Sequence, residues 1–258
     1  MENKVPLVSV IMPVYKARDF VEEAIRSVMA QTVTDWELLV IDDCSPDDSF
    51  EIARALAETD GRIRLLRNEQ NMGVARTRNR GIALRRGKYI ALLDSDDVWY
   101  PGKLSAQLAL LEQTGAALSY CSYRIVDAAG KPVKPDYLVP SRADFEDLLK
   151  ENVVLCSSIV VSSELAKKIR FNTDFYHEDY VFLLDILKEG HTAVGVREPQ
   201  AAWRYMENTR SFDKRKAALN RWRIYRDYLK LPLPRSAYVF TCYAFAGVRK
   251  YFRKRRDA

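Results

Sequence analysis

The stretch K-Y-I-A-L-L-D-S-D-D-V-W-Y-P, residues 88–101, decides the fold class of this chain. Residues 89–93 form a short apolar run, typical of a strand buried on both faces in a parallel sheet. Three carboxylates follow within residues 94–97, at the strand end where open α/β sheets bind ligands. Neighbouring acids repel one another, and a hard divalent cation such as Mg²⁺ or Mn²⁺, shared with substrate phosphates, would relieve that repulsion. The alternative is a solvated acidic turn ahead of a helix that begins near Pro101.

The composition fits one large α/β domain, or such a domain with a small appendage. The chain has 258 residues, of which 48% are hydrophobic, enough for a substantial core. Its four cysteines are scattered and it has only two histidines, so neither a structural zinc site nor a disulfide framework is expected. The N-terminal residues do not resemble a signal peptide, and no uncharged apolar run approaches the roughly 20 residues of a spanning helix. These features predict a cytoplasmic protein.

Positive charge is concentrated at the C-terminal end. Residues 211–258 carry fourteen Lys/Arg against three Asp, whereas the preceding 210 residues carry 27 basic and 32 acidic side chains. A basic tail on a mildly acidic body indicates that the tail meets an anionic surface. It does not indicate a domain that binds nucleic acid.

Strands and helices alternate through the first part of the chain. Strands are expected at residues 8–12, 37–41 and 63–66 ahead of the one quoted above, and helices from Phe20, from Ser45 as the capping residue, from Gly73 to Gly87, and from Pro101. This pattern predicts a parallel sheet covered by helices, with right-handed crossovers. No G-x-G-x-x-G follows the first strand and no G-x-x-x-x-G-K-[ST] occurs, which argues against a dinucleotide-binding dehydrogenase and a P-loop NTPase.

Three of the expected strands end in groups suited to a nucleotide. Tyr15 follows the first strand, the Asp42–Asp43 pair follows the second, and residues 94–97 follow the fourth. An aromatic ring can stack on a base, a carboxylate can accept from a base N–H or a ribose hydroxyl, and the acidic cluster can share a metal with a diphosphate. Arg76 and Arg78, on the helix after Gly73, are suited to phosphate or base oxygens. Taken singly, Tyr15 also fits a core position and the arginines a solvated helix face.

Five segments resemble the family 2 glycosyltransferases, which have the GT-A fold. They are V-S-V-I-M-P-V-Y (8–15), D-W-E-L-L-V-I-D-D-C-S (35–45), N-M-G-V-A-R-T-R-N-R-G-I (71–82), G-K-Y-I-A-L-L-D-S-D-D (87–97) and H-E-D-Y (177–180). The resemblance runs from about Val8 to about Ser211. It implies a Rossmann-like, mostly parallel sheet flanked by helices, and an inverting sugar transfer from a nucleotide diphosphate, usually UDP. The acceptor it implies is a lipid-linked saccharide in bacterial surface-polysaccharide assembly.

The resemblance also implies roles for individual residues. Tyr15 and Asp43 are similar by position to uracil-contacting residues, Asp94 and Asp96 to the D-x-D pair that touches ribose and metal, and Asp179 to the catalytic base. The donor nucleotide site implied in this way comprises Pro13, Val14, Tyr15, Asp43, Gly73, Arg76, Arg78, Asp94 and Ser95, with Asp96 as the ligand of Mn²⁺ or Mg²⁺. The alternative for Asp179 is a carboxylate that only stabilises the N-terminus of a helix over residues 180–188.

One segment departs from the family pattern. The family often carries Y-R-x-H-x-x-S-x-S near residues 203–211, and Met206 stands where that histidine would be. A thioether is a poor ligand for a hard cation, so a third protein contact to the metal is in doubt. Arg204 and Arg210 are candidates to neutralise phosphate charge directly.

The second half of the chain is less regular. We expect strands at residues 118–127 and 155–162 with a loop at 127–140, and an organisation into a nucleotide-sugar-binding half (1–115), an acceptor-binding half (116–211) and a basic, aromatic helical extension (212–258). Helices are expected over residues 214–230 and 236–248, the second uncharged and aromatic before a basic end. Such a helix suits either a bilayer surface or a packed position on the domain.

Two other functions fit part of the sequence. Residues 92–98 match the first motif of haloacid-dehalogenase-type phosphatases, in which Asp94 would be the nucleophile and Asp96 the acid. That motif usually closes the first strand of its domain, whereas here three strands precede it. A nucleotide-sugar-binding protein with weak catalysis is the other alternative, because of Met206.

Overall fold

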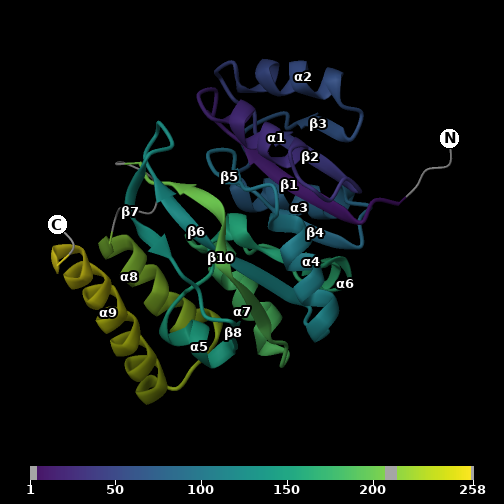
Figure 1. Ribbon diagram of the computed structural model, residues 1–258. Coiled ribbons are helices and arrows are strands. Elements are labelled where there is room, and N and C mark those ends of the chain that lie inside the picture. The colour runs from purple at the N-terminus through teal and green to yellow at the C-terminus, as the bar shows by residue number, and fades with distance from the viewer. Residues whose placement is uncertain (1–4, 207–213, 257–258) are drawn as a thin grey trace.

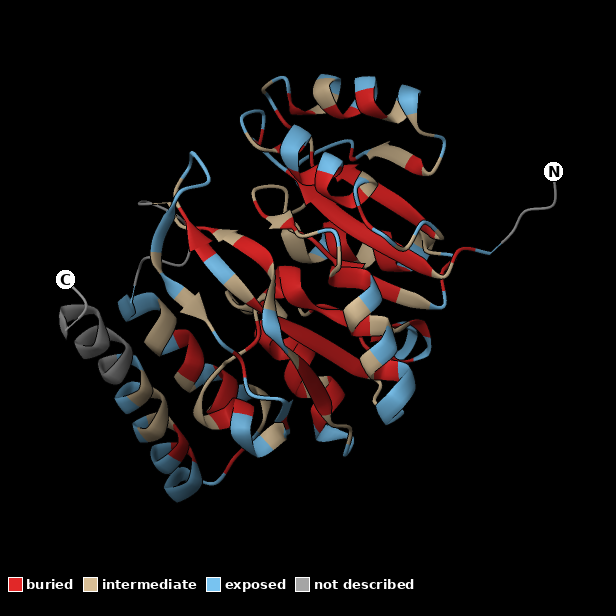
Figure 2. Ribbon diagram, viewed as in Figure 1, coloured by how far each residue is buried: buried red, intermediate tan, exposed pale blue. Residues whose placement is uncertain are grey.

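A single sheet extends through both halves of the molecule in the computed structural model, which describes residues 5–206 and 214–256. The strand order is β3-β2-β1-β4-β9-β6-β10-β5, with β7 paired to β6 and β8 to β10 (Figure 1). The sheet interior is buried, whereas the helices that cover it keep an exposed outer side (Figure 2). The predicted α/β class with a central sheet between helices is confirmed.

The first four main strands run parallel and place their carboxyl ends at one edge. They are β1 (Val8–Val14), β2 (Trp36–Asp42), β3 (Ile63–Arg67) and β4 (Tyr89–Leu92), and the helices after them are α1 (Val21–Met29), α2 (Ser49–Thr59), α3 (Val74–Leu84) and α4 (Lys103–Thr114). Every residue of β1 and β2 is buried, because helices cover both faces. The predicted alternation of strands and helices in this region is confirmed.

The second half makes the sheet mixed. It contributes β6 (Leu118–Val126), β7 (Pro132–Tyr137), β8 (Arg142–Ala143), β9 (Val160–Ser162) and β10 (Ala193–Arg204), while the short β5 (Val98–Trp99), which pairs antiparallel with β10, precedes α4. The short β9 lies antiparallel between β4 and β6 and so joins the two halves, while β10 runs parallel to β6.

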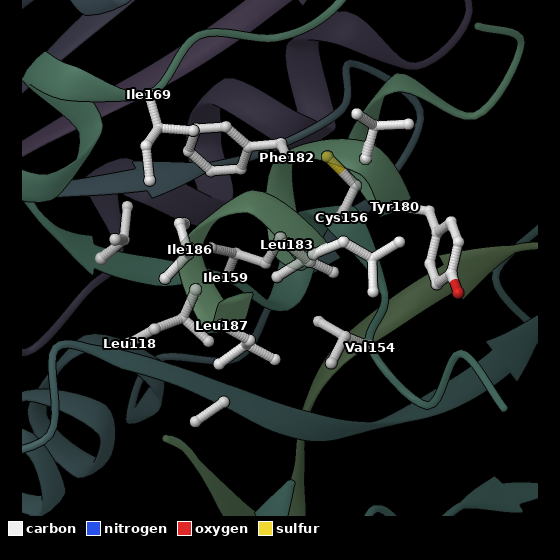
Figure 3. Packing of buried hydrophobic residues seen from close by; sticks show 14 of the residues in the cluster. Leu118, Val154, Cys156, Ile159, Ile169, Tyr180, Phe182, Leu183, Ile186 and Leu187 are labelled. Carbon is white, nitrogen blue, oxygen red and sulfur yellow. The ribbon is translucent and has the colours of Figure 1, made fainter. Parts of the chain in front are cut away.

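The helix α7 (Glu178–Lys188) is the centre of the larger core. Its residues from Tyr180 to Leu184 are all buried, and they pack against side chains of β6 and of the segment before β9, including Val154 and Cys156 (Figure 3). The helices α5 (Phe145–Lys150) and α6 (Ser163–Lys168) and the 3-10 turn η1 (Cys156–Ser158) complete this layer. The start of α7 is therefore held by a dense apolar environment.

The C-terminal extension is a helical hairpin packed on the domain. It consists of α8 (Lys214–Arg223), a π-helical turn η3 (Ile224–Tyr228) and α9 (Leu233–Arg256), with α8 between α9 and the sheet (Figure 1). The Tyr225 hydroxyl donates to the Leu149 carbonyl on α5 at 2.5 Å, and Val239 of α9 is buried. The sequence allowed the extension to lie at a bilayer surface or to pack on the domain. The inner face of the hairpin packs on the domain. Among the described residues, no helix is apolar over a length that would cross a bilayer.

Several local predictions were wrong. The second helix begins at Ser49 with Asp48 before it, because the Ser45 hydroxyl accepts from the Lys16 amide instead. The segment 127–140 contains β7 as well as turns, and β10 was not predicted. The helix before Gly87 ends at Leu84, and Gly87 is required because a Cβ there would lie 2.5 Å from the Ser9 nitrogen.

Candidate active site

The end of β1 presents one aromatic ring to solvent. Pro13 and Val14 are buried strand residues, whereas the next residue, Tyr15, is 45% exposed. Lys16 then turns the backbone with a φ of 53°, and its amide donates to Ser45 Oγ at 3.2 Å. The Tyr15 ring is therefore at the carboxyl edge of the sheet and available to a planar ligand.

Asp43, after β2, organises the loop that leads into α3. Its carboxylate is 3% exposed and accepts from the Asn68 side chain at 2.7 Å and from the Met72 and Gly73 amides, each at 2.8 Å. Gly73 has a φ of +84°, which favours glycine at this position. Contact of Asp43 with a nucleobase stays a prediction, and its contacts to the loop are a role that the sequence did not reveal.

The acidic turn after β4 is held from below by Ser157, a buried residue of η1. The Ser157 hydroxyl donates to Asp97 at 2.5 Å and accepts from the Asp94 amide at 3.1 Å. Asp97 also accepts from the Arg204 amide at 3.0 Å, and it is 2% exposed. Burial raises the pKa of Asp97 well above its ordinary value, and the charges of Asp96 and Asp94 add to that rise. Asp97 therefore stabilises the turn from its buried side.

The other two acids of the turn face the open side of the site. The side chain of Asp94 is 31% exposed, and Ser95 and Asp96 are half-buried. Burial and the charge of Asp94 raise the pKa of Asp96 to about 6. The negative charges of Asp94 and Asp96 repel each other, and a divalent cation would relieve that repulsion. Carboxylate oxygens are also the hard ligands that such a cation prefers. Within residues 5–206 and 214–247, no group of three or more acidic, histidine or cysteine side chains forms a complete metal cage.

Arg204 lies behind the turn and is 3% exposed. Its guanidinium donates to the carbonyls of Asp96 at 2.9 Å and Ala128 at 2.7 Å, and it pairs with Glu23 at 2.6 Å. This geometry favours a supporting role over the direct diphosphate contact expected from the sequence. Met206 is half-buried just beyond β10, and Arg210 lies outside the described residues.

Arg78 joins two sequence motifs that lie far apart in the chain. Its side chain, on α3, is 4% exposed and bonds to Asp94 at 2.5 Å and to Glu178 at 2.9 Å. Although burial opposes its charge, Asp94 and Glu178 contribute to raising the pKa of Arg78, so the guanidinium stays a cation. The exposed Arg76 lies on the same helix. No role was predicted for Glu178 from the sequence, although it lies within the H-E-D-Y segment.

Asp179 is the second residue of α7 and is half-buried. Its neighbourhood is shown by Cys156, a buried thiol beneath the site. Burial raises the pKa of Cys156, Arg78 opposes that rise, and Asp94 and Asp179 reinforce it. Because Arg78 contacts both Asp94 and Glu178, the D-x-D and E-D segments lie close together in space. A carboxylate in the first turn is also favoured by the positive end of the helix.

Comparisons with known proteins agree with this geometry. The family model described as "Glycosyl transferase family 2" matches residues 9–181. A relative from Bacillus subtilis, described as a putative teichuronic acid biosynthesis glycosyltransferase (TuaG), is 34% identical, with 97% of this chain and 99% of the relative covered. A relative from Escherichia coli, described as UDP-Glc:alpha-D-GlcNAc-diphosphoundecaprenol beta-1,3-glucosyltransferase (WfgD), is 33% identical, with 95% of each chain covered.

Two solved structures share the fold. S. aureus TarS 1–349 in complex with UDP-GlcNAc superposes with a TM-score of 0.71 at 17% identity, covering 92% of this chain and 71% of that one. A mannosyltransferase from Pyrobaculum calidifontis in complex with GDP-Man and Mn²⁺ gives a TM-score of 0.73 at 18% identity, covering 94% and 70%. The predicted GT-A fold is thereby confirmed.

Proposed function

The chain belongs to glycosyltransferase family 2, and from that premise we propose that it transfers a sugar from a UDP-linked donor to a hydroxyl of a lipid-linked saccharide. The observation that carries the proposal is the bridge from Arg78 to Asp94 and Glu178, which brings the D-x-D and E-D segments together. A UDP donor and a diphosphoundecaprenol-linked acceptor are supported by the description of the E. coli relative, which spans nearly the whole chain. The family match also leaves no support for the phosphatase alternative.

The donor nucleotide is assigned to the carboxyl ends of β1, β2 and β4. The exposed ring of Tyr15 is suited to stack on the uracil, and the loop that Asp43 holds, with the exposed Arg76 just beyond it, borders the same edge. We assign the exposed side of the Asp94 carboxylate to a hydrogen bond from a ribose hydroxyl.

Asp96 and the open side of Asp94 would hold Mn²⁺ or Mg²⁺, with the donor diphosphate and water completing the ligands. Their hard oxygens suit either ion, whereas the sulfur of Met206 does not. The bound cation supplies positive charge that stabilises the departing diphosphate. Arg78, with its charge held by Asp94 and Glu178, adds a fixed positive group behind the same acids.

Asp179 is assigned as the general base. Among the described residues none donates a hydrogen bond to its carboxylate, which leaves the lone pairs free for an acceptor hydroxyl. In the proposed step, Asp179 takes the hydroxyl proton while the oxygen attacks the anomeric carbon from the face opposite the nucleotide. The bond from that carbon to the diphosphate oxygen breaks at the same time, and UDP leaves with the bonding electrons. One displacement of this kind inverts the anomeric configuration. A well-placed base typically contributes roughly 10²–10⁴ in rate.

The acceptor suggests where the enzyme works. The outward side of α9 carries Pro234, Ala237, Tyr238, Thr241 and Phe245 at helical spacing, all of them exposed and none charged. Six Lys/Arg follow between residues 249 and 256. An apolar stripe with aromatic rings and a basic end fits the interface of an anionic bilayer. We assign α9 as the peripheral contact with the membrane that holds the lipid-linked acceptor.

The function is tested by incubating the protein with UDP-Glc, other UDP-sugars and GDP-Man, with Mn²⁺ or EDTA, and a diphospholipid-linked saccharide. The expected result is UDP release and a lengthened saccharide, both dependent on acceptor and metal. Phosphate release from phosphoesters without sugar transfer would contradict the proposal. Tight UDP-sugar binding without any transfer would instead identify the binding-protein alternative.

A further inference from the structure

Asn220, a buried residue of α8, holds the segment that leads into the E-D motif. Its side-chain oxygen accepts from the Tyr176 amide at 3.0 Å. Its side-chain nitrogen lies 3.3 Å from Nδ1 of His177. Asn220 is 5% exposed, so both contacts are shielded from competing water. The backbone just before Glu178 is therefore tied to the C-terminal hairpin.

Arg221, the next residue of α8, holds the other side of the motif. Its guanidinium lies 3.4 Å from the ring centre of Tyr180, the residue directly after Asp179. The ring of Tyr243 on α9 lies 4.8 Å from the same guanidinium. Among the described residues its Nε and one Nη have no hydrogen-bond partner. The aromatic rings are thus prominent partners of this buried cation.

The hairpin is itself fixed to the domain at several points. The Tyr228 hydroxyl donates to Asp185 of α7 at 2.6 Å, and the Tyr225 hydroxyl bonds to the Leu149 carbonyl. Within the hairpin, Trp222 packs edge-on against Phe240 at 5.4 Å. All hairpin residues lie beyond the family match, which ends at residue 181. The family match therefore contains the E-D pair and Arg78 but not the hairpin residues that contact the segment.

We propose that Asn220 and Arg221 are positioning residues that fix the start of α7, and with it the carboxylate of Asp179. The inference rests on the proposed function only in taking Asp179 as the base. The orientation of this carboxylate depends on where the backbone of residues 176–180 lies, because no described side chain donates to it. A displacement of about 1 Å in a reacting group can cost about 10²-fold in rate. The C-terminal hairpin is thus a part of the active site.

The primary test compares Asn220→Ala with Leu219→Ala, its neighbour on α8, which is 68% exposed. In steady-state transfer assays with a soluble acceptor analogue, Asn220→Ala is expected to lower kcat about 10-fold at unchanged KM for the UDP-sugar. Leu219→Ala is expected to retain both constants. Asn220→Asp keeps an acceptor oxygen for the Tyr176 amide, so it should recover most of the lost kcat. If the alanine variant does not fold, Arg221→Lys carries the test, because it keeps the charge but loses the planar contact with the Tyr180 ring, and it should also lower kcat at unchanged KM.

A second readout needs no substrate. Hydrogen exchange of the amides in residues 175–181 should become at least 10-fold faster in Asn220→Ala and should stay at the parental rate in Leu219→Ala.

Unchanged kcat in Asn220→Ala, or in Arg221→Lys where the alanine variant does not fold, would overturn the inference, and so would an equal loss of kcat and donor affinity. Failure of the proposed function looks different: the parent protein shows no transfer, or Asp179→Asn transfers at the parental rate, while the exchange result still reports whether α8 holds the segment.

Discussion

The two sides of the site are built in different ways. On the donor side, Tyr15, Asp43 and Asp94 directly follow parallel strands, so the sheet itself brings them to one edge. On the acceptor side, Asp179 begins a helix whose place depends on Arg78, a hundred residues earlier, and on Asn220, more than forty residues later. Neighbouring strand ends thus bring together the groups that we assign to the donor, although Ser157 and Arg204 from later in the chain also hold the acidic turn. The helix start that carries Asp179, the residue we assign as the base, instead depends on side chains far away in the sequence.

The largest expected effect comes from Arg78, which spans the two sides. Arg78→Met removes a buried cation and leaves Asp94 and Glu178 without their shared partner. Breaking a buried ion pair in this way typically costs about 3–5 kcal/mol of folding free energy. Urea unfolding should show a loss of that size, together with lower affinity for UDP and slower transfer.

The control for this variant is Arg76→Met, two residues earlier on the exposed side of α3. Its free energy of unfolding should change by less than about 0.5 kcal/mol. If the two variants were equally stable, Arg78 would not join the two sides of the site.

Burial of the Lys103 side chain in the core lowers the stability of the folded protein. Its amino group is fully buried 4.0 Å from the ring centre of Trp99, and burial lowers its pKa to about 8. Below pH 8 the folded protein bears the full cost of burying this cation. Between pH 8 and the ordinary lysine value of about 10.4 the cost fades, because the folded state releases its proton before the unfolded state does.

Lys103→Met should therefore stabilise the protein by about 1–3 kcal/mol at pH 7, an advantage that shrinks as pH rises toward about 10.4. Urea unfolding at pH 7, 9 and 10.5 measures it. A variant less stable than the parent at pH 7 would show that the contact with Trp99 outweighs the cost of burial.

Ser157 tests how far the acidic turn of the donor side depends on a contact from later in the chain. Ser157→Ala removes the hydrogen bonds to Asp97 and to the Asp94 amide, so the acidic turn should loosen. We expect Mn²⁺-dependent UDP affinity to fall about 10-fold, and stability by about 1–3 kcal/mol. Ser158→Ala, equally buried but bonded only to the Leu155 carbonyl, should lose stability without losing UDP affinity. Equal UDP affinities in the two variants, measured by calorimetry, would remove Ser157 from the donor side.

The smallest effect is expected on the surface of α9. Replacing Tyr238 and Phe245 together by serine should weaken binding to phosphatidylglycerol-containing vesicles about 3- to 10-fold, with UDP affinity unchanged. Val133→Ser, on an exposed position of β7, is the matched control. Vesicle flotation at low and high salt separates the apolar contribution of α9 from the electrostatic contribution of its basic end, since salt weakens only the second. A parent protein that does not bind such vesicles would contradict the membrane assignment.

Much of the donor side was predictable because its signals are local. The apolar runs before Tyr15, Asp43 and Asp94 predict strands, and parallel strands place their ends together. The alternation of elements also sufficed for the fold class. The predicted helix start at Ser45 was wrong because the Ser45 hydroxyl accepts a hydrogen bond from the amide of Lys16, in the bend after β1.

The acceptor side was predictable only in part. The E-D motif pointed to Asp179, but nothing near it in sequence pointed to Asn220 or Arg221, since the contacts depend on how the hairpin folds back. Arg204 was a candidate to neutralise phosphate charge, and that role stays a prediction. Its contacts with the carbonyls of Asp96 and Ala128, which the sequence did not reveal, favour a supporting role for it instead.

We propose that donor binding and base catalysis depend on different sides of the site. The most direct test measures UDP-sugar affinity with Mn²⁺ and the transfer rate side by side in Asp96→Asn and Asp179→Asn. Asp96→Asn should lose the Mn²⁺ enhancement of donor binding, whereas Asp179→Asn should bind the donor as the parent does and transfer about 10²–10⁴-fold more slowly. Near-parental transfer by Asp179→Asn, or parallel losses of affinity and rate in both variants, would contradict the account.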